Sequence, residues 1–217
     1  MSEQAAAIPH QHQFDDAEQQ YEASALGMWA FLATEIMFFG GLFTAYALYR
    51  SMYPAAFGHA SNHLDLVLGT VNTAVLIGSS LTMALAVHAS EVGHRRLLVT
   101  FLLTTMVLGS VFLGIKGVEY YSKFVDHLVP GPNFHWPGAD PQHVQLYFSL
   151  YFAMTGLHAL HMVIGLGVLS VLVYRAQRGQ FGPGYHNPVE MTGLYWHFVD
   201  IIWIFLFPLL YLIERHH

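Results

Sequence analysis

The chain has 217 residues, of which 54% are hydrophobic and only 10% are charged, whereas a soluble domain carries about 25% charged residues. This apolar excess, together with a net charge of −6 and the absence of cysteine, excludes a soluble enzyme, a disordered tail, a nucleic-acid-binding protein and any site built on thiolates. The solvent for most of this chain is therefore expected to be lipid.

Residues 1–24 form a polar segment rich in Asp and Glu. The segment contains no Lys or Arg, so it lacks the basic region that begins a signal peptide. We predict a solvated, acidic N-terminal arm with a short surface helix near its end.

Residues 25–213 are predicted to form a single transmembrane domain. A helix needs about 20 apolar residues to cross the bilayer core, and strands would show an alternating pattern that is absent here. Backbone groups in lipid must pair within their own segment, which favours helices. The prediction is an all-α integral membrane protein, a bundle of five helices with spans at about 25–49, 64–88, 97–121, 144–174 and 191–213.

The basic residues between the spans indicate how the chain crosses the membrane. Basic residues collect on the cytoplasmic side of membrane proteins. The side that holds the N-terminus receives Arg95, Arg96, Arg175 and Arg178. The other side receives Arg50, Lys123 and Arg215. We therefore expect the N-terminus inside, the C-terminus outside, and the proline-rich segment 122–143 outside.

Glu35 is an ionisable residue inside the first predicted span. It lies roughly ten residues into that span, about 15 Å deep at helical rise. A charged side chain at the bilayer centre costs about 2.5–3.5 kcal/mol, so such groups rarely face lipid alone. Glu35 is expected to be protonated or paired with a group on a neighbouring helix; a purely structural hydrogen bond in the bundle is the alternative.

Two further spans carry polar residues at helical spacing. His158 and His161 lie on one stripe of the fourth span, and His197 and Asp200 are three residues apart in the fifth. Asp200 is expected to accept a hydrogen bond from His197 or from a partner helix. By rise counting, Glu35, His161 and Asp200 reach similar depths, which permits a shared polar belt.

The histidines do not form an evident metal or haem site. His158 and His161 leave the same face of one helix, so they cannot hold the two sides of one haem. A non-haem site would need a carboxylate beside the histidines, and Glu35 together with the histidines could in principle supply one. We interpret these histidines as bundle residues and predict no metal and no cofactor in this chain.

Charged residues at the ends of the spans have simpler interpretations. Lys116 and Glu119, three residues apart in the third span, are predicted to form a helix-end ion pair in which the lysine snorkels toward water. Arg175, His186 and Glu190 lie around the last connection on the N-terminal side. Because arginine binds phosphate well, this cluster indicates a phospholipid headgroup site; positive-inside anchoring is the alternative.

Five segments, one in each span and in order, carry a family resemblance. They read ATEIMFFGGLFTAY (Ala33–Tyr46), NTAVLIGSSLT (Asn72–Thr82), LGSVFLGIKGVEY (Leu108–Tyr120), TGLHALHMVIG (Thr155–Gly165) and YWHFVDIIWIFLF (Tyr195–Phe207). From Leu26 to Tyr211 the chain resembles subunit III of the haem–copper oxidases, specifically the bacterial cytochrome c oxidase subunit III.

The resemblance implies a subunit without redox centres in the proton-pumping complex that reduces O2 in a bacterial inner membrane. In that family the haems and copper belong to subunits I and II, and a small subunit IV or a respiratory supercomplex can be further partners. Subunit III binds phospholipid, stabilises subunit I and supports proton uptake. The positions that match are Glu35 as the intramembrane glutamate, His158, His161, His197 and Asp200 as bundle polar residues, and Arg175, His186 and Glu190 near the lipid headgroup.

Two departures from the family pattern are visible. Mitochondrial-type members have seven spans, and this chain has only the last five, as in many bacterial members. Lys116 stands where the family usually has glutamine. Other functions that fit the sequence are a subunit III of a quinol oxidase, a nitric-oxide-reductase-associated relative, and a free-standing membrane cytochrome or transporter.

Overall fold

The computed structural model describes residues 14–212, which form helices and connections with no strand beyond one isolated bridge between Gly182 and Tyr185. The helices are α1 (Ala17–Met52), α2 (Pro54–Ser61), α3 (Leu66–Glu91), α4 (Arg95–Val125), α5 (Pro141–Gln177) and α6 (Asn187–Tyr211). Among these, 5 are long and apolar enough to cross a membrane. The prediction of an all-α membrane protein with five spans is confirmed.

The first helix begins earlier than the polar composition of the arm suggested. The Asp16 carboxylate accepts a hydrogen bond from the backbone N–H of Gln19 at 2.7 Å, which caps the helix and starts it at Ala17. The end of the predicted arm is therefore the first turns of α1. Residues 1–13 of that arm and residue 213 of the fifth predicted span lie outside the described residues.

A short helix, α2, occupies what the sequence indicated as a connection. Pro54 stands at its first turn, where the missing N–H is no loss. Phe57 is buried and meets Tyr147 of α5 edge to face, with ring centroids 5.4 Å apart. The helix thus packs on α5 at one end of the bundle.

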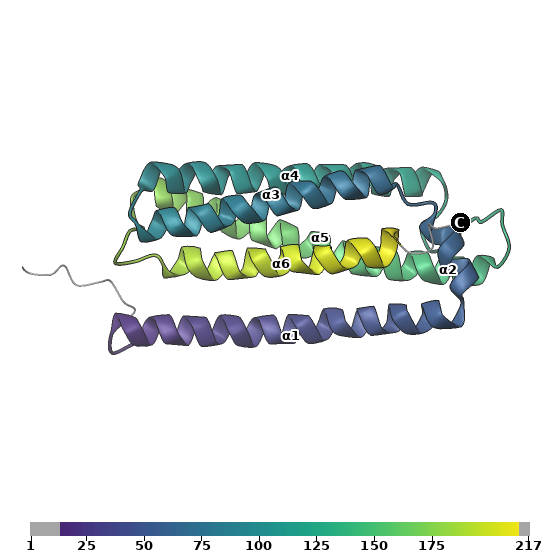
Figure 1. The fold of residues 1–217 in the computed structure, drawn as a ribbon, viewed down its shortest axis with the longest axis horizontal. Coiled ribbons are helices and arrows are strands. Elements are labelled where there is room, and N and C mark those ends of the chain that lie inside the picture. The colour runs from purple at the N-terminus through teal and green to yellow at the C-terminus, as the bar shows by residue number, and fades with distance from the viewer. Residues whose placement is uncertain (1–13, 213–217) are drawn as a thin grey trace, which may run out of the picture.

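The long helices lie side by side along one axis (Figure 1). We call the end with the start of α1 and the α3–α4 and α5–α6 connections the N-terminal end, and the end with α2 and the α4–α5 connection the C-terminal end. Helices α3, α4, α5 and α6 pack together, whereas α1 lies along one side and contacts mainly α6 and α5. This arrangement leaves two flanks of α6 partly open, one toward α1 and one beside α3.

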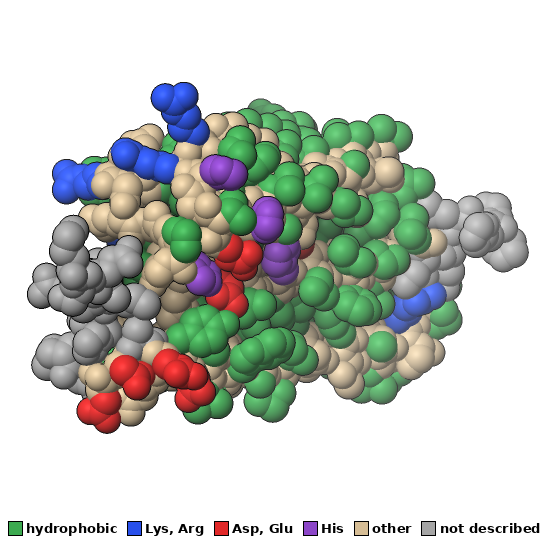
Figure 2. All heavy atoms as spheres, turned by 60° about the vertical axis from the view of Figure 1, so that its left-hand side comes forward, with side chains coloured by type: hydrophobic (Ala, Val, Ile, Leu, Met, Phe, Trp, Pro, Cys, Tyr) green, Lys and Arg blue, Asp and Glu red, His purple; other side chains and the backbone are tan. Residues whose placement is uncertain are grey.

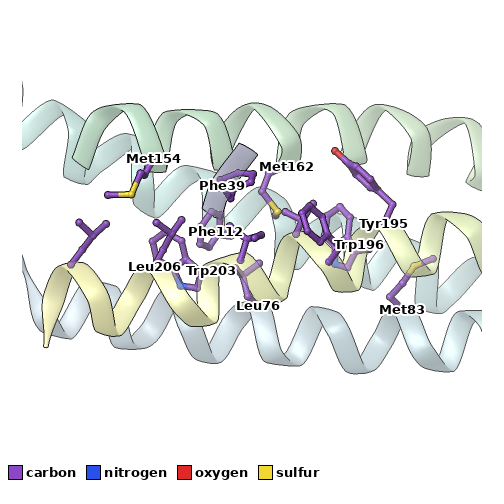
Figure 3. Packing of buried hydrophobic residues seen from close by; sticks show 14 of the residues in the cluster. Phe39, Leu76, Met83, Phe112, Met154, Met162, Tyr195, Trp196, Trp203 and Leu206 are labelled. Carbon is purple, nitrogen blue, oxygen red and sulfur yellow. The ribbon is translucent and has the colours of Figure 1, made fainter. Parts of the chain in front are cut away.

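The core lies between α6 and its neighbours and is built on large side chains (Figure 3). Trp196 and Trp203 of α6 are fully buried. Their indole N–H groups donate to hydroxyls of α3, to Ser79 and Thr73 respectively, each at 3.1 Å. Because a buried indole N–H needs an acceptor, these bonds fix the register of α6 against α3.

Candidate functional site

The intramembrane glutamate of α1 faces a histidine of α5. Glu35 Oε2 lies 3.2 Å from His161 Nε2, and the side chains are 19% and 11% exposed. The other ring nitrogen, Nδ1, lies 2.9 Å from the carbonyl oxygen of Leu157, so it must donate its hydrogen there. Nε2 is thus the ring nitrogen that faces the Glu35 carboxyl group.

Aromatic rings enclose this pair. The ring centroid of Phe39 lies 5.5 Å from that of His161, and the Tyr195 ring stacks on His161 at 6.4 Å. The Tyr195 hydroxyl donates to the backbone oxygen of His161 at 2.9 Å. The pair joins α1 to α5 at mid-length of α1, in surroundings that exclude most water.

The predicted stripe on α5 is divided between two environments. His158 is 1% exposed and lies between the rings of Phe112 and Trp203, at 5.3 and 5.2 Å. Neither of its ring nitrogens has a hydrogen-bond partner within the described residues. His161 faces α1, whereas His158 points into the core, so the two histidines do not act on one group.

His197 and Asp200 of α6 do not pair with each other. Nδ1 of His197 lies 2.7 Å from the Ser80 hydroxyl of α3, and the described residues offer no hydrogen bond to either carboxyl oxygen of Asp200. The predicted bond between His197 and Asp200 does not form, and Nδ1 of His197 pairs with the Ser80 hydroxyl instead. Asp200 faces the α3 side of α6, away from the Glu35–His161 pair, so the three do not form one belt.

Lys116 and Glu119 lie in a buried network near the C-terminal end. Lys116 Nζ donates to Glu119 Oε2 at 2.9 Å and to the hydroxyls of Tyr151 and Tyr211 at 3.1 and 2.8 Å. Both tyrosine hydroxyls in turn donate to Glu119 Oε1. Each charged residue is only 3% exposed. The prediction of snorkelling was wrong, because the tyrosines of α5 and α6 solvate the ammonium group inside the bundle.

The N-terminal end carries the cluster predicted for a lipid headgroup. Arg175 donates through Nε to Gln180 at 2.8 Å and lies over the Phe181 ring at 5.1 Å. His186 Nε2 lies 3.8 Å from Glu190 Oε2, and Glu190 Oε1 accepts from the Tyr21 hydroxyl of α1 at 2.8 Å. Figure 2 looks toward this end, with basic side chains at its upper edge, acidic ones at its lower edge, and histidine and acidic side chains between.

An apolar groove runs between α1 and α6. Its volume is about 480 Å³, and Trp29, Phe39 and Phe43 of α1 face Phe198 and Phe205 of α6 across it. Its lining is almost wholly hydrocarbon and aromatic, which suits a chain of methylene groups. Phe39 lies between the groove and His161, so the groove and the Glu35–His161 pair share one wall.

Within residues 14–212, no group of three or more His, Asp or Glu side chains is placed to hold a metal ion. The histidines inside the bundle point to a glutamate, a serine and an aromatic pocket instead.

The family model described as cytochrome c oxidase subunit III matches residues 12–214. The chain belongs to the cytochrome c oxidase subunit III family. It is therefore a subunit of a haem–copper oxidase complex and a multi-pass membrane protein. The resemblance carried by the five spans is confirmed.

Curated relatives cover nearly the whole chain. It is 32% identical over 212 residues to "Cytochrome c oxidase subunit 3" of Thermostichus vulcanus, covering 97% of this chain and 94% of that one. It is 37% identical over 188 residues to the protein of the same name from Synechocystis, covering 86% and 74%. A "Probable cytochrome c oxidase subunit 3" of Nocardia farcinica is 33% identical over 190 residues, covering 88% of both chains.

Sequence reasoning missed the neutral partners of the charged residues. Tyr21, Ser80, Tyr151 and Tyr211 each bond a residue that the sequence singled out. Each of these partners is 32 to 169 residues away along the chain from the residue that it bonds, so no local spacing predicts the contact. The run Gly78–Ser80 signals close helix packing, but it does not indicate a partner for His197.

Proposed function

We propose that this subunit III carries no redox centre and acts in a bacterial inner membrane as the lipid-binding, stabilising and proton-supporting partner of subunits I and II. The names of its relatives support the cytochrome c branch over a quinol oxidase. The haems and copper of the complex would then lie in the partner subunits. The chain has no cysteine, and its intramembrane histidines do not converge on a common point.

The observation that carries this proposal is the Glu35–His161 pair beside an apolar groove. An acyl chain in the α1–α6 groove would cover Phe39, which forms one wall of the pair's enclosure. Lipid there would keep water from the carboxyl group and would hold α1, the least embedded helix, against α6. Lipid binding and the state of the glutamate are thus linked through one aromatic ring.

The polar cluster at the N-terminal end suits the headgroup of such a lipid. Nη2 of Arg175 lies 3.5 Å from the Tyr185 hydroxyl, a long contact with which a phosphate could compete. The Glu190 carboxylate bonds Tyr21 and lies close to His186, and it offers an acceptor to an ammonium headgroup. The resemblance to the family further implies a small subunit IV, or membership of a respiratory supercomplex, as an additional partner.

The pair is also suited to proton transfer near subunit I. A shared proton between Glu35 and His161 can move over 3.2 Å without rearranging the backbone. Nδ1 of His161 is held by the Leu157 carbonyl, so the ring keeps one nitrogen on the glutamate through the transfer. This arrangement supports a role of the pair in holding or passing protons.

Removal of the subunit from the purified oxidase tests the proposal. We expect the depleted complex to keep its initial electron transfer, because the redox centres lie elsewhere, but to lose activity faster during turnover or to take up protons more slowly. Oxygen consumption over many turnovers and proton uptake after a single turnover measure both. Unchanged durability together with unchanged proton uptake would contradict the proposal.

Readdition separates the two roles of the subunit. The wild-type chain should restore durability, and the Glu35→Gln chain should restore it equally if the glutamate only holds α1 to α5. If Glu35 is proton-active, the Glu35→Gln complex should bind lipid and assemble normally but should take up protons more slowly. Lipid content, measured by mass spectrometry of the complex, is the control for assembly.

A further inference from the structure

The flank of α6 beside α3 contains a cavity with a different character from the α1–α6 groove. Its volume is about 380 Å³, and it opens to the outer face of the bundle. The polar residues that line it are Thr73, Ser80, His197 and Asp200. Three of these are engaged inside the chain, since Thr73 accepts from Trp203, and Ser80 bonds His197. Asp200 is the exception.

The Asp200 side chain is buried, and no partner among the described residues meets hydrogen-bond geometry. The residue is 3% exposed, and neither carboxyl oxygen has a partner of hydrogen-bond geometry within the described part of the chain. The Ser80 hydroxyl lies close to the carboxyl group but is engaged by His197 Nδ1 at 2.7 Å. Buried polar groups in proteins are almost always paired, and the few exceptions point to a missing ligand, water or neighbour. In lipid no bulk water is available to supply the missing bond. Asp200 is therefore an acceptor in a cavity that nothing in this chain fills.

The depth of the cavity restricts what can fill it. Asp200 lies thirteen residues after Asn187 and eleven before Tyr211, which places it about 20 Å from one end of α6 and a few ångström less from the other. Phospholipid donors stay at the membrane surface, because their headgroups do, and acyl chains carry no donor. The group that meets Asp200 must belong to something that carries a donor at mid-membrane.

The surface around the cavity is suited to another helix. Thr73, Ser80 and Ala84 are small residues on one stripe of α3, and small residues allow helix backbones to approach closely in membranes. Leu81 and Ile204 stand at the rim, 62% and 48% exposed. An apolar rim around one buried acceptor is the complement of an apolar helix that carries one donor.

From these observations we infer that the α3–α6 flank docks a transmembrane helix of another subunit, which places a hydrogen-bond-donating side chain on Asp200. The donor class is Lys, Arg, Asn, Gln or a hydroxyl-bearing residue at mid-membrane. The bond fixes the depth and rotation of the docked helix, because Asp200 is the one acceptor in the cavity without a partner among the described residues. The α1–α6 groove, whose lining is apolar, is left to lipid.

Two substitutions of Asp200 test the inference in the assembled oxidase. The complex is purified through a tag on another subunit, and the amount of this chain that stays bound is measured over increasing detergent. Asp200→Leu should weaken retention about three- to fifteenfold, the range measured for hydrogen bonds between membrane helices. Asp200→Asn should lie closer to wild type, because its amide oxygen still accepts. Equal retention of wild type and Asp200→Leu would overturn the inference.

Folding of the chain itself is the control for these variants. Because the carboxyl group has no internal partner, Asp200→Leu should leave the thermal unfolding of the isolated full chain unchanged or raise its midpoint. A loss of stability in the isolated chain that accounts for the loss of retention would assign Asp200 an internal role and would also overturn the inference.

Cross-linking identifies the occupant directly. The chain has no cysteine, so Leu81→Cys introduces a unique thiol at the rim of the cavity, and a maleimide–benzophenone probe attached there captures what lies next to it. A product with another membrane-spanning subunit is expected. The same probe at Val107→Cys of α4, which is 62% exposed at similar depth, should not give that product. Capture of lipid or a small lipophilic molecule alone from Leu81→Cys would overturn the inference.

Discussion

Lys116 and Glu119 carry opposite charges in a part of the bundle that water does not reach. The ammonium group is surrounded by ring faces as well as donor–acceptor contacts, with Trp203 at 5.0 Å and Tyr151 at 5.1 Å from Nζ. Burying a charge is tolerated only when its partner and its remaining hydrogen bonds are in place. The two tyrosine hydroxyls supply these remaining hydrogen bonds. Because they belong to α5 and α6, the ion pair of α4 also links the three helices.

Removing one member of the pair should therefore destabilise the fold strongly. Lys116→Met leaves the Glu119 carboxylate buried with the hydroxyls alone, and breaking such a pair costs about 3–5 kcal/mol. The double variant Lys116→Met/Glu119→Gln removes both charges and should be more stable than Lys116→Met. Unfolding in mixed SDS micelles, followed by tryptophan fluorescence, measures both free energies. The single variant Glu119→Gln completes the cycle, and a double variant as unstable as the sum of the two single losses would show that the pair is not coupled.

The sequence predicts which charged residues meet, but it does not predict the neutral side chains that surround them. Helical spacing correctly suggests that Lys116 meets Glu119 three residues later, because such residues share a face. Nothing in that spacing reveals Tyr211, which follows Lys116 by 95 residues and meets it only through the packing of α6 on α4. The same holds for Ser80, which binds His197 in place of the expected Asp200.

Trp196 shows how the long helices approach one another. Its ring lies in a slot between two glycines: a Cβ at Gly109 of α4 would stand 2.8 Å from Trp196 Cη2, and one at Gly165 of α5 would stand 2.9 Å from Cζ3. Neither position has room for a side chain. In lipid, where apolar burial drives association little, this close fit and the Trp196–Ser79 hydrogen bond hold α6 in place.

Adding a single methyl group in this slot should loosen the bundle. Gly109→Ala forces the buried Trp196 ring to move, and overpacking of this kind costs about 1–3 kcal/mol. The matched control is Gly114→Ala on the same helix, where a Cβ meets nothing within 4 Å and where alanine should stabilise the helix by about 0.5–1 kcal/mol. Thermal unfolding of the two variants in detergent should shift in opposite directions. Equal shifts would show that the slot does not set the packing of α6.

Hydropathy predicts the long helices well and their ends less well. Each span is a run of apolar residues long enough for the bilayer, and that requirement needs no tertiary knowledge. The start of α1 depends on the cap made by Asp16, and α2 depends on Phe57 finding Tyr147 across the bundle. Composition marks both stretches as polar or proline-containing, so their helices are visible only once caps and contacts are known.

The helices of this chain leave part of the bundle surface uncovered. Helix α1 packs mainly against α6 and α5, and both flanks of α6 open outward, one apolar and one with a buried acceptor. A chain that belongs to an oxidase complex gains from such flanks, since lipid and neighbouring helices can occupy different ones. The order of the helices then decides which flank faces which side of the complex, and their direction decides which end meets the cytoplasm.

Direction is the property of the whole chain that can be measured most simply. The N-terminal end holds Arg95, Arg96, Arg175 and Arg178, and we expect that end inside. Since the chain has no cysteine, Asn133→Cys in the α4–α5 connection and Gln177→Cys at the end of α5 each give one thiol, both at exposed positions. A membrane-impermeant maleimide should label Asn133→Cys in intact spheroplasts and Gln177→Cys only after lysis. The reverse pattern would place the N-terminus outside and would move the Arg175–Glu190 cluster to the opposite leaflet.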